Sequence, residues 1–265
     1  MLKQRLLSAA LGIPLIFAAI WFGDPWFTLL VEVVAVIAVY EFYEIIATKV
    51  STWSLFGMVW VVLMVLGAHS DDSRVMGALI AGAVILPLAW FAWHPAEDAF
   101  NGWVWTLAGI IYVGWMLSHL AGLRRMEDGR DWVILVIFVT FATDSAAYLV
   151  GRTWGRHKMA PVISPGKTWE GAAGGLVGGV AATVVLAMIM DMTPHPMNIG
   201  ETIGLGLLIP VFAQIGDLAE SLLKRTAGVK DAGHLIPGHG GMLDRMDSII
   251  FSVVITYYFV VWFIA

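Results

Sequence analysis

Long apolar runs follow one another along this chain and leave few ways for it to fold. A helix that crosses a membrane needs about 20 successive apolar residues. Nine runs near that length occur, at 6–23, 26–47, 53–68, 75–93, 102–122, 132–151, 171–190, 202–219 and 247–265. Only 13% of the 265 residues are charged, against about 25% in soluble domains. We therefore predict an all-α, polytopic integral membrane protein with about nine transmembrane helices.

The composition also bounds the domain organisation and the class of function. No linker or low-complexity segment divides the chain, so we predict one membrane domain over 1–265. Within it, 1–131 are expected to form a helical scaffold, and 132–265 to carry the functional helices and loops. The absence of cysteine excludes disulfides and zinc–thiolate sites. The chain has no basic tract of the kind that binds nucleic acid, so we expect no such partner.

The distribution of lysine and arginine predicts the orientation in the membrane. Cytoplasmic loops are enriched in these two residues. With the N-terminus inside and nine alternating spans, 11 of the 15 fall on the cytoplasmic side. The loops 152–170 and 220–246 then share that side. We expect a multi-pass protein of the cytoplasmic (inner) membrane, with its active site facing the cytoplasm.

One stretch, 217–247, concentrates polar residues in an otherwise apolar chain. Its charged or titratable side chains include Asp217, Glu220, Lys224, Arg225, Lys230, Asp231, His239, Asp244, Arg245 and Asp247. At about 100° per residue, Asp217, Glu220 and Lys224 share one face of a helix. Asp244 and Asp247 share a face at the start of the last apolar run. The segment between them, GHLIPGHGG at 233–241, is too rich in glycine and proline for regular helix.

These residue types indicate the chemistry of the stretch. Carboxylates beside lysine and arginine suit hard divalent cations and phosphate oxygens. The glycine-rich segment offers backbone N–H groups in a nest that suits phosphate oxygens as well. The alternative is an ordinary charged loop between two membrane helices, which the spacing alone does not exclude.

A second polar region begins inside the sixth apolar run. Asp144 near its end is either a functional carboxylate or a buried one that Ser145 or a neighbouring helix satisfies. The basic loop 152–170 follows, and its Gly166-Lys167-Thr168 suggests a P-loop. That interpretation fails, because Pro161 stands where the motif needs glycine and no strand is expected before the loop. A basic loop with Lys167 close to the next span remains.

Glycines recur at every fourth position of the seventh run, at Gly171, Gly175 and Gly179. Small residues at this spacing let the backbone of another helix approach closely. We therefore predict tight helix packing here, which would bring the two polar loops together.

Two of these segments resemble the motifs of a known family. The run S-L-L-K-R-x4-K-D-A-G-H-L-I-P-G-H-G-G-M-L-D-R-M-D, from Ser221 to Asp247, is similar to the C-terminal motif of phosphatidate cytidylyltransferases, the CDP-diacylglycerol synthases. D-S-A-A-Y-L-V-G-R from Asp144 and S-P-G-K-T-W-E-G from Ser164 also resemble that family, although Gly166 stands where it more often has lysine. The resemblance rests on motifs over roughly 144–247 and on hydropathy before them.

The resemblance implies an enzyme that transfers a cytidylyl group from CTP to phosphatidate and releases pyrophosphate. CTP, phosphatidate and membrane lipid are the expected partners, and Mg²⁺, with room for a second cation, is the expected cofactor. The catalytic residues that we expect are Asp217, Lys224, Asp244 and Asp247. The expected metal ligands are Asp217, Asp244 and Asp247, with Asp144 as a further candidate. The expected substrate and phosphate contacts are Lys167, Glu220, Arg225, Lys230, His239, Gly240, Gly241 and Arg245.

Several individual roles stay open at this point. His239 either donates to phosphate or braces the loop. Glu220 either holds a metal-bound water or orients Lys224. Glu32, Glu41 and Glu44, in the second apolar run, are left outside the predicted site.

Two other functions also stay open. A CTP-dependent lipid kinase would release CDP rather than pyrophosphate. A cation transporter would bind its ion near the bilayer midplane, whereas these carboxylates gather at helix ends.

A homodimer is compatible with the sequence.

Overall fold

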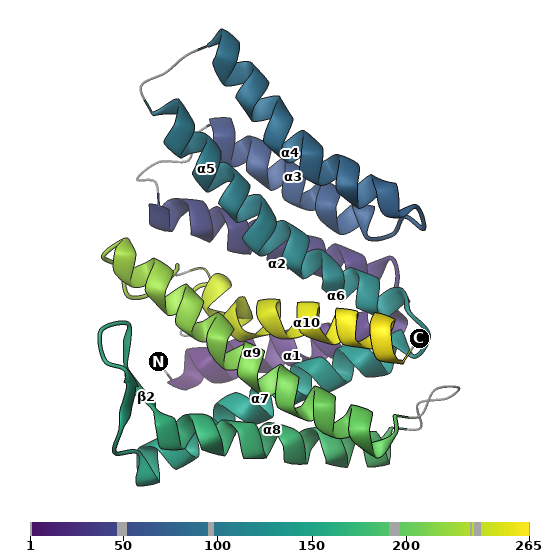
Figure 1. Ribbon diagram of the computed structural model, residues 1–265, viewed down its shortest axis with the longest axis vertical. Coiled ribbons are helices and arrows are strands. Elements are labelled where there is room, and N and C mark those ends of the chain that lie inside the picture. The colour runs from purple at the N-terminus through teal and green to yellow at the C-terminus, as the bar shows by residue number, and fades with distance from the viewer. Residues whose placement is uncertain are drawn as a thin grey trace. The chain divides into compact units, whose positions relative to one another are not determined.

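The helices of the protein follow its apolar runs, because backbone groups in lipid must bond within their own segment. The structure, a computed structural model, describes residues 2–46, 52–94, 98–190, 197–233, 235 and 240–264. Its helices are α1 (Leu2–Phe22), α2 (Trp26–Ile46), α3 (Thr52–Gly67), α4 (Ser73–Trp93), α5 (Ala99–Gly109), the π-helical η1 (Ile110–Trp115), α6 (Met116–Arg125), α7 (Gly129–Trp154), α8 (Trp169–Ile189), α9 (Ile199–Thr226) and α10 (Leu243–Phe263) (Figure 1). The predicted all-α class is confirmed.

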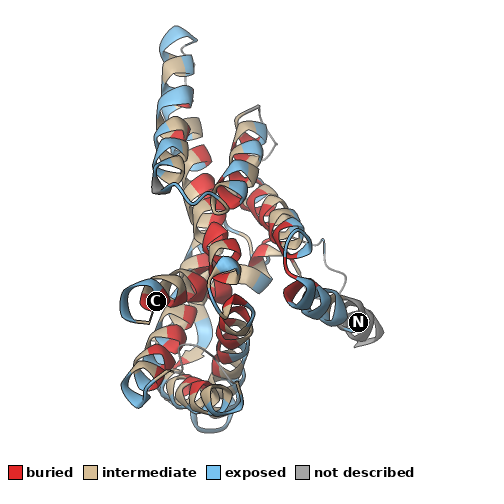
Figure 2. Cartoon of the chain, turned by 90° about the vertical axis from the view of Figure 1, so that its right-hand side faces the viewer, coloured by how far each residue is buried: buried red, intermediate tan, exposed pale blue. Residues whose placement is uncertain are grey.

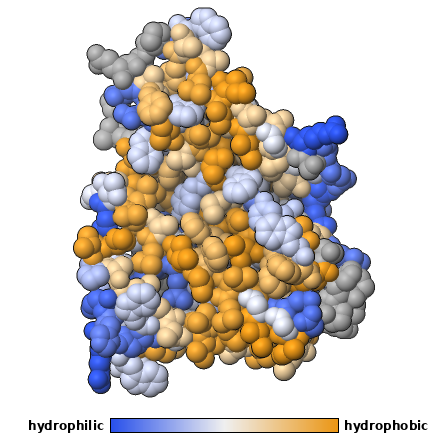
Figure 3. Space-filling view, in the orientation of Figure 1, coloured by the Kyte–Doolittle hydropathy of each residue, from blue (hydrophilic) through white to orange (hydrophobic). Residues whose placement is uncertain are grey.

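Six helical segments of the described residues are long and apolar enough to cross a membrane. They are Arg74–Trp93, Ala99–Arg125, Gly129–Trp154, Trp169–Ile189, Ile199–Thr226 and Leu243–Phe263. Shorter apolar stretches occupy Gly12–Phe22 and Trp53–Gly67. Hydrophobic side chains cover much of the face drawn in Figure 3, as lipid contact requires. The prediction of a polytopic membrane protein is confirmed.

The internal contacts of the chain divide it into two compact units. The first unit comprises Met1–Gly122 and Asp231–Asp244, and the second comprises Leu123–Lys230 and Arg245–Ala265. The glycine-rich loop therefore groups with the N-terminal helices, which its position in the sequence does not suggest. Within each unit the buried residues lie on helix faces that meet (Figure 2).

In the first unit, the ring of Tyr43 on α2 is enclosed by two glycines. A Cβ at Gly109 of α5 would lie 2.6 Å from the ring, and one at Gly57 of α3 would overlap the hydroxyl. That hydroxyl donates to the carbonyl of Thr106 at 2.9 Å. The two glycines thus let α3 and α5 close on α2.

In the second unit, the predicted packing of the glycine stripe is confirmed. A Cβ at Gly175 of α8 would lie 3.0 Å from the Cβ of Ala147 and 3.1 Å from the carbonyl of Thr143, both on α7. One at Gly179 would overlap Pro210 of α9. The stripe therefore lets α8 pack closely against both α7 and α9.

The basic loop predicted over 152–170 is shorter in the structure, because α7 ends at Trp154 and α8 begins at Trp169, and it contains the only strands among the described residues. β1 (Lys158–Ala160) pairs antiparallel with β2 (Ser164–Thr168), and Lys158 lies opposite Thr168. Thr168 then caps α8, because its side chain accepts the N–H of Gly171 at 3.1 Å. Lys167 lies in the strand itself and not in a glycine-rich turn after it, so this hairpin has no P-loop geometry.

Candidate active site

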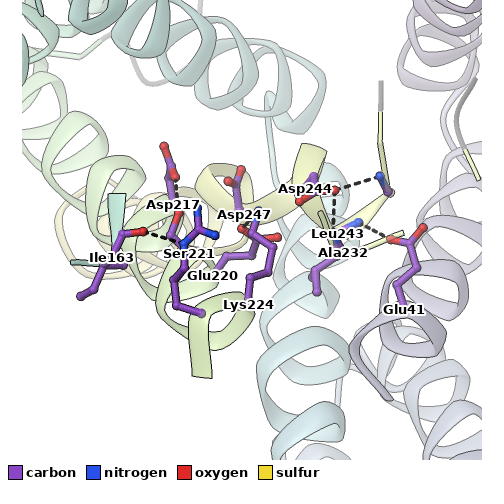
Figure 4. A network of polar contacts seen from close by, with 12 residues as sticks. Glu41, Ile163, Asp217, Glu220, Ser221, Lys224, Ala232, Leu243, Asp244 and Asp247 are labelled. Atoms are coloured by element: carbon purple, nitrogen blue, oxygen red, sulfur yellow. Dashed lines mark hydrogen bonds and ion pairs between the residues drawn. The ribbon is translucent and has the colours of Figure 1, made fainter. Parts of the chain in front are cut away.

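The C-terminal half of α9 presents its polar side chains as one ladder. The hydroxyl of Ser221 donates to the Asp217 carboxylate at 3.3 Å, one turn before it. On the same face, Glu220 and Lys224 form an ion pair. The side chain of Glu220 is 0% exposed and that of Lys224 is 14% exposed. The shared face predicted for these residues is confirmed, and Glu220 takes the arrangement expected of a residue that orients Lys224 (Figure 4).

The hairpin meets this face of α9 through Lys167. Its ammonium lies 2.9 Å from Oδ2 of Asp217 and donates to the carbonyl of Gln214 at 3.4 Å. The Gln214 amide in turn donates to the carbonyl of Ala172 on α8 at 3.3 Å. Lys167 is therefore held directly by α9. The contact of Gln214 with Ala172 connects this part of α9 to α8 as well.

Arg225, the last basic residue of α9, provides a second link to the hairpin. Its Nε donates to the carbonyl of Ile163, in the hairpin turn, at 3.2 Å. With the Lys167–Asp217 pair, this contact places the hairpin beside the C-terminal end of α9. The next basic residue, Lys230, is exposed.

Asp144 on α7 and Asp247 on α10 complete a cluster of carboxylates in the second unit. Asp144 interacts electrostatically with Asp217, Lys167 and Arg245, and the Ser248 side chain forms a hydrogen bond with it. Asp247 interacts with Asp217 and Asp144, and with Lys224 of the opposite charge. The close approach of α9 and α10 that allows this depends on Gly216, where a Cβ would overlap the carbonyl of Asp247.

The donor chemistry of this cluster fits a magnesium ion. Mg²⁺ is usually held by one or two carboxylates together with substrate phosphates, and it retains several waters. Among the described residues, no three acidic, histidine or cysteine side chains form a ready metal cage. Asp144, Asp217 and Asp247 nevertheless repel one another, and a divalent cation would relieve that repulsion.

Asp244, the other expected ligand, has contacts of its own in the first unit. Its Oδ2 accepts the N–H groups of Ala232 at 3.0 Å and Gly241 at 2.9 Å. Gly240 beside it has a φ of 83°, which glycine adopts freely. The Gly241 N–H is thus already engaged within the loop. His239 lies outside the described residues, and the metal role of Asp244 stays a prediction.

Comparison with known proteins places the chain in a family. The model of the Cytidylyltransferase family matches residues 3–263. The chain belongs to the cytidylyltransferase family. It is 35% identical over 262 residues to a phosphatidate cytidylyltransferase of Brucella suis biovar 1 (strain 1330), covering 97% of this chain and 93% of the relative. It is 32% identical over 254 residues to the phosphatidate cytidylyltransferase of Staphylococcus haemolyticus (strain JCSC1435), covering 94% and 95%. It is also 31% identical over 259 residues to the uncharacterized protein YnbB of Escherichia coli (strain K12), covering 94% and 84%.

The family predicted from the sequence motifs is confirmed, and this cytidylyltransferase is an enzyme of the nucleotidyltransferase class. Its structure adds residues that the motifs did not single out. Gln214, whose carbonyl accepts from Lys167, is one of them. Its polar side chain one turn before Asp217 is the signal that could have found it, whereas Ser248 shares the predicted helix face of Asp244 and Asp247. Glu41 lies outside the predicted site, and its partner could not be found from sequence spacing.

Proposed function

We propose that this protein transfers the cytidylyl group of CTP to phosphatidate at the cytoplasmic face of the membrane, with Mg²⁺ as cofactor. The observation that carries the proposal is the cluster of the second unit. There, Asp144, Asp217 and Asp247 lie within electrostatic range of Lys167, Lys224 and Arg245. The names of the relatives from Brucella and Staphylococcus support the choice of phosphatidate as the acceptor.

The reaction needs charge neutralisation more than it needs a strong base. A phosphate monoester has a second pKa near 6, so the head group of phosphatidate is largely dianionic at neutral pH. One of its oxygens attacks the α-phosphorus of CTP. The bond from that phosphorus to the oxygen bridging the α- and β-phosphates breaks, and pyrophosphate leaves with the electron pair. The barrier lies in bringing two anions together and in the charge that develops on the leaving group.

The residues of the second unit divide these tasks by charge. Asp217, Asp247 and Asp144 would hold Mg²⁺, which neutralises phosphate oxygens when it is bound. Lys167 and Lys224 would contact the reacting phosphates, since each ammonium lies beside a carboxylate of the α9 ladder. Arg225 and Arg245 would orient the anionic groups at the edge of the cluster.

Further phosphate contacts are proposed from the motif alone. We assign these to Lys230 just before the glycine-rich loop and to the segment 239–241. Asp244 is retained as a candidate metal ligand, in addition to the loop contacts of its Oδ2. These assignments rest on the motif and on the donor chemistry of the residues.

The test is to incubate the purified protein with phosphatidate, Mg²⁺ and each of the four nucleoside triphosphates, and to follow the products by phosphorus NMR. We expect pyrophosphate and CDP-diacylglycerol with CTP alone, and no product after chelation of Mg²⁺. Release of CDP with a phosphorylated lipid would instead establish a lipid kinase.

Two variants connect the activity to the cluster. We expect Asp247→Asn to abolish turnover while the protein still inserts and purifies normally. Asp131→Asn is the matched control, because Asp131 lies in the first turn of α7 and pairs with Arg130. Turnover of Asp247→Asn at the wild-type rate would remove Asp247 from the site.

A further inference from the structure

We infer that Glu41 is a positioning residue whose buried carboxylate, carried by α2, caps the start of α10 and fixes the glycine-rich loop of the first unit. Glu41 is 1% exposed. The inference deepens the proposed function, because this loop and the first turn of α10 carry residues assigned to the active site. Figure 4 shows Glu41 directed at Leu243, with Asp244 and Ala232 nearby.

The hydrogen bonds of Glu41 identify it as a helix cap. Its Oε2 accepts the N–H of Leu243, the first residue of α10, at 2.8 Å, and Met242 provides a second backbone N–H bond. The first N–H groups of any helix lack partners within the helix. A side chain next to the helix start usually satisfies them, and a negative charge there also interacts favourably with the helix dipole. Here the capping carboxylate lies 202 residues away in sequence.

Two glycines of the loop leave room for this carboxylate. A Cβ at Gly233 would lie 2.5 Å from Oε1 of Glu41, and one at Gly241 would lie 2.5 Å from Oε2. Real Cβ atoms do not come so close, so neither position accepts a side chain while Glu41 stays in place. These glycines are therefore explained by their contact with Glu41 as well as by any role in phosphate binding.

Glu41 and Asp244 together accept hydrogen bonds from several backbone N–H groups of the loop. Asp244 accepts those of Ala232 and Gly241, while Glu41 accepts those of Met242 and Leu243. Both ends of the loop are thereby tied to carboxylates, and one of the two carboxylates comes from α2. It follows that the position of Asp244 depends on Glu41.

Amide hydrogen exchange of the full-length protein in detergent tests the cap directly and requires no activity. In Glu41→Ala we expect peptides covering 241–246 to exchange about tenfold faster, since a charged acceptor of buried N–H groups is lost. Peptides from α7 and α8 should be unchanged. Glu41→Gln should stay close to wild type, because the amide oxygen can still accept. Glu44→Ala is the control, because Glu44 lies one turn on, is exposed and accepts from Tyr40.

A second comparison keeps the inference testable if Glu41→Ala folds poorly. Gly233→Ala should accelerate exchange in the same peptides by itself, whereas Gly77→Ala should not, because a Cβ at Gly77 meets nothing within 4 Å. In the background of Glu41→Ala, the effect of Gly233→Ala should largely vanish, since the overlapping carboxylate is gone. Unchanged exchange in Glu41→Ala, or additive effects of the two changes, would overturn the inference.

Kinetics separate positioning from general stability. We expect Glu41→Ala to lower kcat more than it raises the KM for CTP, and Glu41→Gln to restore most of kcat. If wild-type protein made no CDP-diacylglycerol, the proposed function would fail while the exchange result still decided the role of Glu41. A Glu41→Gln variant as impaired as Glu41→Ala in both measurements would contradict capping.

Discussion

The ammonium of Lys167 on β2 lies 2.9 Å from the carboxylate of Asp217 on α9, with the two side chains 21% and 33% exposed. Partly exposed ion pairs stabilise a fold only slightly, so the importance of this pair is positional. It holds a cation beside a carboxylate that we assign to the metal. An arriving phosphate would thus meet the ammonium and the metal ion at one place.

Replacement of Lys167 should therefore affect turnover more than folding. We expect Lys167→Met to lower kcat roughly 100-fold, the order seen when one group that stabilises transition-state charge is removed. The melting temperature should change little. Lys158→Met is the matched control, since Lys158 is an exposed lysine of the same hairpin. Equal kinetics of the two variants would exclude Lys167 from the reaction.

The ion pair of Glu220 and Lys224 should behave in the opposite way, as a contributor to stability. Lys224→Met removes the ammonium beside a carboxylate that is 0% exposed, and breaking a buried pair costs about 3–5 kcal/mol. We expect a clear drop in melting temperature. The double variant Glu220→Gln/Lys224→Met should recover most of it, because the buried charge is also removed.

Thermal unfolding in one detergent, with the four proteins of this cycle compared, measures the coupling. Activity should not recover in the double variant if Lys224 also acts on phosphate. A double variant less stable than Lys224→Met would show that the pair is not the source of the effect.

The two polar loops should be accessible from the same side of the membrane. The contact of Arg225 with Ile163 places the hairpin beside the end of α9. Single cysteines at Thr153 and Thr226, in a chain without native cysteine, should react with an impermeant thiol reagent from the cytoplasmic side. A cysteine at Glu127, just before the N-terminal end of α7, should react from the opposite side of the membrane. Labelling of Thr153 and Thr226 from opposite sides would rule out a shared active site.

The glycine stripe of α8 predicts a steric effect on stability. Gly179→Ala would force a Cβ into Pro210 of α9, and overpacking of this kind costs about 1–3 kcal/mol. Gly166→Ala is the control, because a Cβ at Gly166 meets nothing within 4 Å. The melting temperature in detergent should fall for the first variant alone. A drop for both would point to the loss of glycine itself and not to the contact with α9.

The helices could be predicted from the sequence, because apolar length alone decides which segments cross a membrane. The ladder of Asp217, Glu220 and Lys224 could be predicted too, since helical spacing places residues on one face. Such local patterns need no knowledge of the remaining fold.

The hairpin and the cap of α10 could not be predicted in this way. β1 and β2 are short and polar, and they carry no alternating pattern that would mark a strand. Glu41 lies in an apolar run, and its acceptor role depends on a loop 202 residues further along. Contacts of this kind depend on how helices pack, which one sequence without relatives does not reveal.

The π-helical turn of η1 gives the segment Ala99–Arg125 one place where its length can change without loss of packing. A π turn accommodates an extra residue within a helix. Deletion of one residue from a regular helix rotates the segment that follows by about 100°. Deletion of one residue from 110–115 would instead restore the regular hydrogen-bond ladder, so Leu117 and Ala121, which are 0% and 1% exposed, would keep facing the core of the first unit. Single-residue gaps in relatives of this protein are therefore expected within η1 and not in α5 or α6.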